Sequence, residues 1–220
     1  MVARLQVEEL KSPNIDCLPR QTRAALRFFS MSTFLTDDWY LAGGTALTLQ
    51  AGHRRSVDLD FFTPNSLFKI DTIERALLAT KKWETKIREE GTLFGEFVQA
   101  KASFIAYPFF IPSPKRLSFG AVRVLSKEDI AVMKIIAVSQ RGRKRDFVDL
   151  YWYCRNVEPL GALLRRAPRQ YPGQEENIPH FLKSLVYFED AESDPMPTLY
   201  FQTSWTIIKA FFRKEIRKIV

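Results

Sequence analysis

The sequence is poor in cysteine and histidine, and neither residue type forms a metal-binding pattern. The two cysteines, Cys17 and Cys154, are far apart in the chain, and His53 and His180 lie in no His-x-x-x-His or Cys/His cluster. A disulfide framework and a zinc site are therefore not expected, and the cytoplasm is the expected compartment.

Long apolar runs are also missing. No uninterrupted stretch of about 18 apolar residues occurs, so no membrane span is expected. The chain start lacks the basic-then-apolar pattern of a signal peptide. With 220 residues, 46% of them apolar and 18 of them Phe, the chain can still bury a substantial core in one large domain or two small ones.

The charge is unbalanced towards the basic side. Lys and Arg number 33 against 25 Asp and Glu, which gives a net charge of +8. Such an excess favours a polyanionic partner through an attraction that does not depend on sequence. A basic solvated surface is the alternative interpretation of the same excess.

Residues 41–62, LAGGTALTLQAGHRRSVDLDFF, carry the most informative pattern. The apolar residues 39–42 predict a buried strand. Gly43 and Gly44 allow a sharp turn and a close approach of the backbone to a ligand. Thr45 is the expected cap of a short helix that reaches Gln50.

Two carboxylates follow on the next predicted strand. Residues 57–61 alternate, so the strand period of two places Asp58 and Asp60 on one face. Their Cα atoms would lie roughly 6.6 Å apart. Two oxygen ligands on one rigid edge suit Mg²⁺ (or Mn²⁺), which proteins hold with one or two carboxylates plus substrate phosphates. A charged sheet end without a metal is the alternative.

The glycine turn followed by Asp-Leu-Asp resembles the nucleotidyltransferase fold of the polymerase-β type. The longer sequence pattern GGTAL…HRRSVDLDFF resembles the AbiEii-type nucleotidyltransferases, many of which are toxins of bacterial toxin–antitoxin pairs. The resemblance implies a metal-dependent enzyme that moves a nucleotide from a nucleoside triphosphate to a hydroxyl acceptor, with tRNA or another RNA as the expected acceptor. It also implies a cognate antitoxin as a partner.

The remaining pattern predicts an α+β protein: a polymerase-β-type lobe over residues 1–122, with a mixed sheet flanked by helices, followed by a helical lobe over 123–220. Further strands are expected at 83–88, 92–98 and 101–107, and Pro108, Pro112 and Pro114 are expected to end the sheet region. The expected helices are 18–31, 67–80, 126–140, 146–155, 160–170, 179–188 and 204–219. Residues 190–197 are expected to form an acidic loop.

Residues 126–153 form a second constellation that resembles the AbiEii pattern of an Asp and a Lys on one helix, a basic turn, and Asp-x-x-Asp-Leu-Tyr on the next. Asp129 and Lys134 match the first part, and Asp146 and Asp149 match the last. The resemblance implies that Lys134 contacts nucleotide phosphate and that Asp149 lies near the reacting centre. A helix–helix salt-bridge network of Lys134, Arg145 and these acids is the alternative interpretation.

The predicted nucleotide site consists of Gly43, Gly44, Thr45, Ser56 and Lys134. Backbone N–H groups after the two glycines would receive phosphate oxygens at a helix start, and Ser56 would form hydrogen bonds near the metal.

Basic and aromatic side chains around this segment leave alternatives open. Arg54 and Arg55 are equally compatible with phosphate contact and with an exposed loop, whereas His53 is expected in an exposed loop. For the aromatic group of Phe104, Tyr107, Phe109 and Phe110, core packing is favoured over base stacking.

One position departs from the family pattern. Polymerase-β-type enzymes usually place a third acid on a neighbouring strand, and here Ser103 stands at that position. A serine cannot supply negative charge or act as a base near neutral pH. Glu96 lies too far along the preceding predicted strand to substitute, so Asp149 is the expected catalytic base beside Asp58 and Asp60, with Asp146 in reserve. A catalytically degenerate nucleotide- or RNA-binding protein on the same fold is the alternative function.

Overall fold

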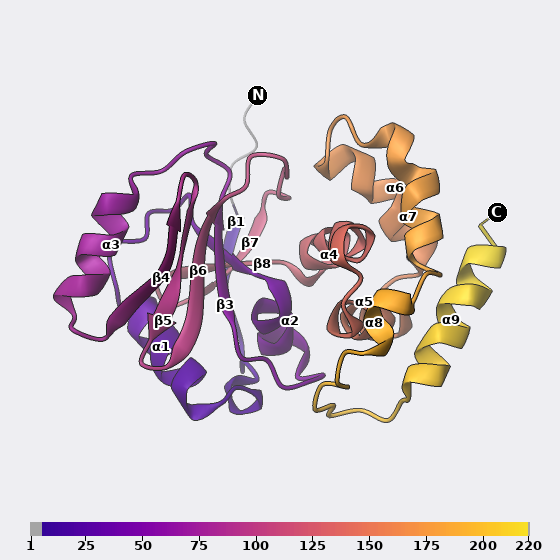
Figure 1. Cartoon of the computed structure of the whole chain (residues 1–220), viewed down its shortest axis with the longest axis horizontal. Helices are drawn as coiled ribbons and strands as arrows, with labels where there is room; N and C mark the ends of the chain where they lie inside the picture. Colours follow the sequence, from indigo (N-terminus) through magenta and orange to yellow (C-terminus); the bar gives the residue numbers. More distant parts are fainter. Residues whose placement is uncertain (1–5, 220) are drawn as a thin grey trace. The chain divides into compact units, whose positions relative to one another are not determined.

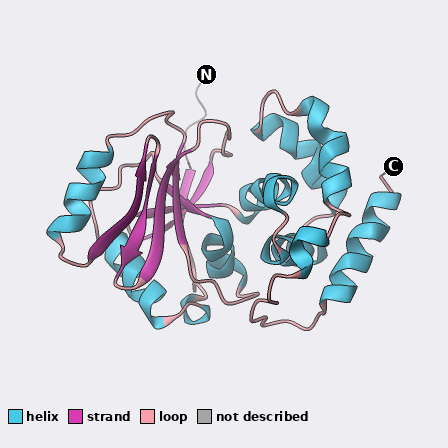
Figure 2. Cartoon of the chain, in the orientation of Figure 1, coloured by secondary structure: helices cyan, strands magenta, loops and turns pink. Residues whose placement is uncertain are grey.

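The structure is a computed structural model that describes residues 6–219. The chain divides into two compact units, one ending at Ser126 and the other beginning at Lys127 (Figure 1). The first unit combines a sheet with helices, and the second consists of helices and their connections (Figure 2). This α+β architecture confirms the predicted fold class. The sequence pattern predicts the boundary between the α+β lobe and the helical lobe at residue 122.

The first unit is built on one eight-stranded mixed sheet, with the strand order β1-β7-β8-β2-β3-β6-β5-β4. The strands are β1 (Gln6–Glu9), β2 (Tyr40–Ala42), β3 (Leu59–Thr63), β4 (Trp83–Glu89), β5 (Thr92–Phe97), β6 (Ala100–Ala106), β7 (Lys115–Phe119) and β8 (Val122–Leu125). Strand β3 lies in the middle, antiparallel to β2 and parallel to β6. Parallel pairs also join β1 to β7 and β2 to β8.

The expectation that the prolines end the sheet region is wrong. Pro108, Pro112 and Pro114 lie in the connection between β6 and β7, after which the chain returns as a hairpin of β7 and β8. Gly120 turns this hairpin with a positive φ of 58°. These strands are only four or five residues long, too short for alternation to stand out in the sequence.

The first unit contains the helices α1 (Arg20–Ser30), α2 (Gly43–Ala51) and α3 (Ile70–Ala79), and a short 3₁₀ turn, η1 (Ile15–Cys17). Helix α1 buries residues at helical spacing, among them Ala25, Leu26 and Phe29. Helix α3 is shorter than expected, and Leu67 lies outside it with 59% of its surface exposed.

An aromatic core fixes α1 to one face of the sheet. The Phe29 ring lies 5.0 Å from that of Phe61 on β3 and 5.9 Å from that of Phe104 on β6. The Phe61 and Phe104 rings stack at 5.2 Å. Because strand side chains alternate between faces, the burial of Phe61 directs its neighbour Asp60 to the opposite face.

The second unit contains α4 (Lys127–Arg141), α5 (Lys144–Asn156), α6 (Leu160–Gln170), η2 (Glu175–Asn177), α7 (Ile178–Ser184), α8 (Glu189–Glu192) and α9 (Trp205–Arg217). Helix α4 packs against α5, α6 and α7, and α5 packs against α9. Phe147 is buried among aromatic rings, including Phe188 at 5.2 Å and Phe212 at 5.6 Å. The acidic loop is expected to begin at residue 190, but its first residues belong to the short helix α8.

Among the helices of residues 6–219, none combines the length and apolar character that crossing a bilayer requires.

Replacing Phe104 should destabilise the first unit, because its side chain is fully buried and contacts four aromatic rings. Phe104→Ala is expected to lower the free energy of unfolding by about 3–5 kcal/mol. Phe109, which is 69% exposed, supplies the control, and Phe109→Ala should change stability by less than about 0.5 kcal/mol. Urea denaturation measures both, and equal losses would contradict this account of the core.

Candidate functional site

The turn between β2 and α2 brings the backbone close to two functional side chains. Gly43 has a φ of +67°, and a Cβ placed on it would lie 2.9 Å from Asp60 Oδ2. A Cβ on Gly44 would lie only 2.2 Å from Arg54 Nη2. A side chain at either position would therefore push the carboxylate or the guanidinium aside, and the left-handed backbone at Gly43 further favours glycine there.

Helix α2 begins at Gly43, so Thr45 lies inside its first turn and the prediction that Thr45 caps the helix is wrong. The N-cap is Ala42, whose methyl side chain cannot accept a hydrogen bond. The first backbone N–H groups of α2 therefore lack a capping side chain from that position, which leaves a helix start suited to an anion.

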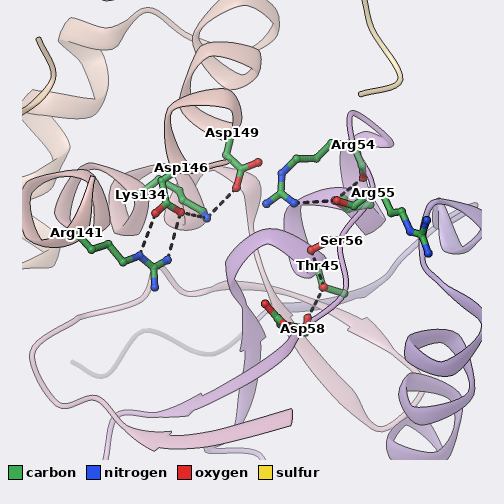
Figure 3. A network of polar contacts seen from close by, with 10 residues as sticks. Thr45, Arg54, Arg55, Ser56, Asp58, Lys134, Arg141, Asp146 and Asp149 are labelled. Atoms are coloured by element: carbon green, nitrogen blue, oxygen red, sulfur yellow. Dashed lines mark hydrogen bonds and ion pairs between the residues drawn. The ribbon is translucent and has the colours of Figure 1, made fainter. Parts of the chain in front are cut away.

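Thr45 instead ties α2 to the segment that leads into β3. Its hydroxyl donates to the backbone carbonyl of Asp58 and lies 3.0 Å from Ser56 Oγ, as Figure 3 shows. One turn later, Thr48 Oγ1 donates to the carbonyl of Arg54 at 3.1 Å. These contacts hold residues 54–58 along the helix and fix the approach of the two aspartates.

The two predicted metal ligands differ in their backbone setting. Asp60 lies in β3, whereas Asp58 lies just before it, and both side chains are half-buried. Ser103 pairs with Asp60 across β3 and β6, and its hydroxyl donates to Asp60 Oδ1 at 2.7 Å. The residue at the predicted third-acid position thus lies beside Asp60, and it orients this carboxylate instead of adding charge.

The donor set fits a magnesium ion that is completed by a substrate. Within residues 6–219, no group of three or more His, Cys, Asp or Glu side chains could hold a metal by itself. Asp58 and Asp60 would supply two oxygen ligands, and Mg²⁺ is commonly held by one or two carboxylates together with phosphates.

The structure separates the basic residues of the preceding segment. Arg54 is only 4% exposed and its Nη1 donates to the carbonyl of Arg55 at 2.9 Å, whereas Arg55 itself is exposed. Because its guanidinium lies against Gly44, Arg54 places a positive charge at the start of α2. His53 is 1% exposed, so its expected place in an exposed loop is wrong.

In the second unit, Lys134 joins two acids of the next helix. Its Nζ lies 2.6 Å from Asp146 Oδ1 and 2.8 Å from Asp149 Oδ2, and both carboxylates are fully buried (Figure 3). Arg141 adds a second cation to Asp146, with Nε at 3.0 Å from Oδ2. The sequence left a salt-bridge network of this kind open as an alternative, with Arg145 as its arginine, whereas the structure places Arg141 on Asp146.

The network keeps Asp146 ionised. Burial by itself raises the pKa of this carboxyl, but the charges of Lys134 and Arg141 and their hydrogen bonds outweigh it and hold the pKa below its ordinary value of 3.8. The ammonium of Lys134 is thus engaged by two carboxylates. Its predicted contact with phosphate, and the predicted chemical role of Asp149, remain predictions.

A further residue, not singled out in the sequence, anchors the helix that carries these acids. The carboxylate of Asp194 accepts from the backbone N–H of Lys144 at 3.0 Å and pairs with Arg143 at 2.9 Å. Lys144 Nζ in turn donates to the carbonyls of Glu192 and Asp194. Asp194 therefore satisfies the first backbone N–H of α5 from 50 residues away, a contact that local sequence periodicity does not predict.

Known proteins resemble this chain in sequence and in fold. The family model described as "Nucleotidyl transferase AbiEii toxin, Type IV TA system" matches residues 28–215. A protein of Aquifex aeolicus (strain VF5), described only as uncharacterised, is 32% identical over 204 residues, covering 91% of this chain and 97% of that protein. The solved structure of MenT4, a nucleotidyltransferase toxin of Mycobacterium tuberculosis H37Rv, superposes with a TM-score of 0.54 at 16% identity, covering 90% of this chain and 84% of MenT4.

Removing Lys134 should destabilise the second unit strongly. Lys134→Ala leaves two buried carboxylates without this cation, and breaking a buried ion pair costs about 3–5 kcal/mol. Lys218→Ala is the control, because that lysine is exposed and pairs with Glu215 at the protein surface; exposed pairs contribute about 1 kcal/mol or less. Thermal and urea unfolding of both variants measure the difference, and a Lys134→Ala protein as stable as the control would point to a role other than structural support.

Proposed function

Because the chain belongs to the AbiEii nucleotidyltransferase toxin family, we propose that it is a metal-dependent enzyme that transfers a nucleotide from a nucleoside triphosphate to a hydroxyl of RNA. A tRNA is the expected acceptor, and a cognate antitoxin is the expected partner. The carrying observation is the close approach of Asp60 and Arg54 to the two consecutive glycines that begin α2.

Each part of this cluster suits one part of a triphosphate. The backbone N–H groups at the start of α2 point where phosphate oxygens would be received. Arg54, held against Gly44, would add a charge-assisted contact to the same phosphates. Asp58 and Asp60 would hold the metal, and Ser103 would keep Asp60 in the rotamer that faces it. When bound, Mg²⁺ would neutralise phosphate charge and align the triphosphate for displacement.

Lys134 and Asp149 have a different status in this proposal. To bind phosphate, Lys134 would have to leave its buried ion pair with Asp149. To act as a base for the acceptor hydroxyl, Asp149 would have to leave the same pair. The contacts within the second unit therefore favour a supporting role for the pair. Its participation in transfer is part of the proposal only through the family resemblance.

The second candidate function is a nucleotide- or RNA-binding protein without catalysis. The observation that favours it is Ser103, which pairs with Asp60 where related enzymes carry a third acid. A serine there can position the carboxylate but cannot take a proton from an acceptor near neutral pH.

Transfer from labelled nucleoside triphosphates to total RNA in the presence of Mg²⁺ tests the proposal. Wild type should label RNA, and both Asp58→Asn and Asp60→Asn should reduce labelling at least about a hundredfold while retaining the wild-type melting temperature, because each removes one metal-binding charge. Asp71→Asn, an exposed acid on α3, is the matched control and should label normally. Labelling by the Asp60→Asn variant at the wild-type rate contradicts the metal site, and gain of labelling only with Ser103→Asp identifies the non-catalytic alternative.

Gly44→Ala should weaken triphosphate binding by about tenfold or more. The added methyl would occupy space that Arg54 Nη2 now fills, so the guanidinium must move away from the helix start, and hydrogen bonds to charged groups contribute about 1.5–3 kcal/mol. Gly161→Ala in α6 is the control, since a Cβ there meets Arg165 at an ordinary 3.5 Å. Calorimetric titration with a triphosphate and Mg²⁺ measures both, and an unchanged affinity for Gly44→Ala would remove Arg54 from the site.

A further inference from the structure

The sheet of the first unit has two unlike faces. On β5, Leu93 and Phe97 are buried on the face that packs against α1, whereas Phe94 between them is half-buried. Asp60 and Phe62 on β3 also alternate away from the buried side. We call the face that carries Asp60, Phe62 and Phe94 the outer face.

Strand register places one row of the outer face in line with the candidate metal ligand. Asp60 pairs with Ser103, Ser103 pairs with Phe94, and Phe94 pairs with Ile87. Paired residues project on the same side of a sheet. Since neighbouring strands lie about 4.8 Å apart, Phe94 is roughly 10 Å from Asp60 at the backbone. Ile87 closes the row with 44% of its surface exposed.

The chemistry of the outer face changes along the strands. In one flanking row, Lys101 pairs with Glu96, which pairs with Glu84. The row of Asp60 and Phe94 has no charge beyond the aspartate itself, and beyond the buried Ser103 it consists of the half-buried Phe94 and the exposed Ile87. Its centre is therefore suited to the flat apolar face of a base, and not to a phosphate group.

Aromatic rings continue from the outer face into the connection after β6. The Phe62 ring lies 5.5 Å from that of Tyr107, and the Tyr107 ring lies 5.8 Å from that of Phe109, which is 69% exposed. The prolines of residues 108–114 restrict the backbone that presents these rings. Aromatic surface thus begins two residues from Asp60 and reaches solvent.

Helix α2 and the aromatic surface lie on opposite sides of Asp60. The helix follows β2, the neighbour of β3 on one side, and packs against β2 and β3 (Figure 1). Strands β6, β5 and β4 extend on the other side. A triphosphate bound at the start of α2 would leave the β6 side of Asp60 for the attacking acceptor.

We propose that the outer face binds an unpaired segment of the acceptor RNA, with Phe94 stacking one of its bases. The inference rests on the proposed function, which supplies a nucleotide at α2 and an RNA hydroxyl at Asp60. Sheets that present aromatic side chains to a nucleic acid stack unpaired bases in this manner, and stacking tolerates any base because every base has a π-face. The net charge of +8 adds attraction to the RNA backbone.

Binding of a fluorescently labelled, single-stranded RNA of mixed sequence to the full chain, without nucleotide, tests this proposal by anisotropy at fixed salt. Phe94→Ala and Phe94→Leu should each weaken RNA binding about fivefold or more, because base–aromatic stacking contributes about 1–3 kcal/mol per base. Phe94→Tyr, which retains the ring, should bind as wild type. Met31→Ala is the control, a 77% exposed apolar residue at the end of α1.

Two further measurements separate this inference from the proposed function. Triphosphate affinity by calorimetry should be the same in all four variants, and sedimentation should show the same oligomeric state as wild type. RNA binding by Phe94→Leu at the wild-type level overturns the stacking role, as does loss of self-association in Phe94→Ala, which would make the outer face a contact between copies of this chain. If wild type transfers nucleotide to RNA while the Phe94 variants bind RNA normally, the enzyme assignment stands and the inference fails.

Discussion

The two glycines at the start of α2, Gly43 and Gly44, set the geometry of the first unit's site. Any side chain on residue 43 would meet the carboxylate of Asp60, and any side chain on residue 44 would displace the guanidinium of Arg54. Strand β2, helix α2 and strand β3 can therefore meet closely enough for a cation and an acid to lie against the helix start. The contacts of Thr45 with Ser56 and Asp58 then hold the connecting segment in place.

The two buried cations, Arg54 and Lys134, lie in different surroundings. Arg54 is nearly inaccessible and lies at the start of α2, the positive end of the helix dipole, where a bound anion would be stabilised. In the second unit, Lys134 is equally buried and lies between two carboxylates. The contacts of Lys134 are those of a structural cation, whereas the proposed phosphate contact of Arg54 rests on its place at the helix start.

Strand alternation connects the core to the proposed chemistry. The packing of Phe29 on Phe61 and Phe104 buries one face of β3 and β6 and directs Asp60 and Ser103 to the other. The aromatic residues that were first considered for base stacking divide accordingly. Phe104 and Phe110 belong to the interior, while Phe109 is exposed, and Phe94, which the sequence did not single out, shares a row with Asp60.

The sequence by itself determined the fold class, the order of most helices and strands, and the family, because the glycine turn and the Asp-Leu-Asp strand are local patterns with fixed spacing. It missed β1, β7 and β8, whose short lengths give periodicity too little room, and it assigned Thr45 to a cap that the helix start at Gly43 precludes. Tertiary structure decided the burial of Arg54, His53 and Lys134, the bond from Ser103 to Asp60, and the anchoring of α5 by Asp194. Each of these features depends on residues distant in the chain or on the packing around a side chain. Local sequence periodicity carries no information about either.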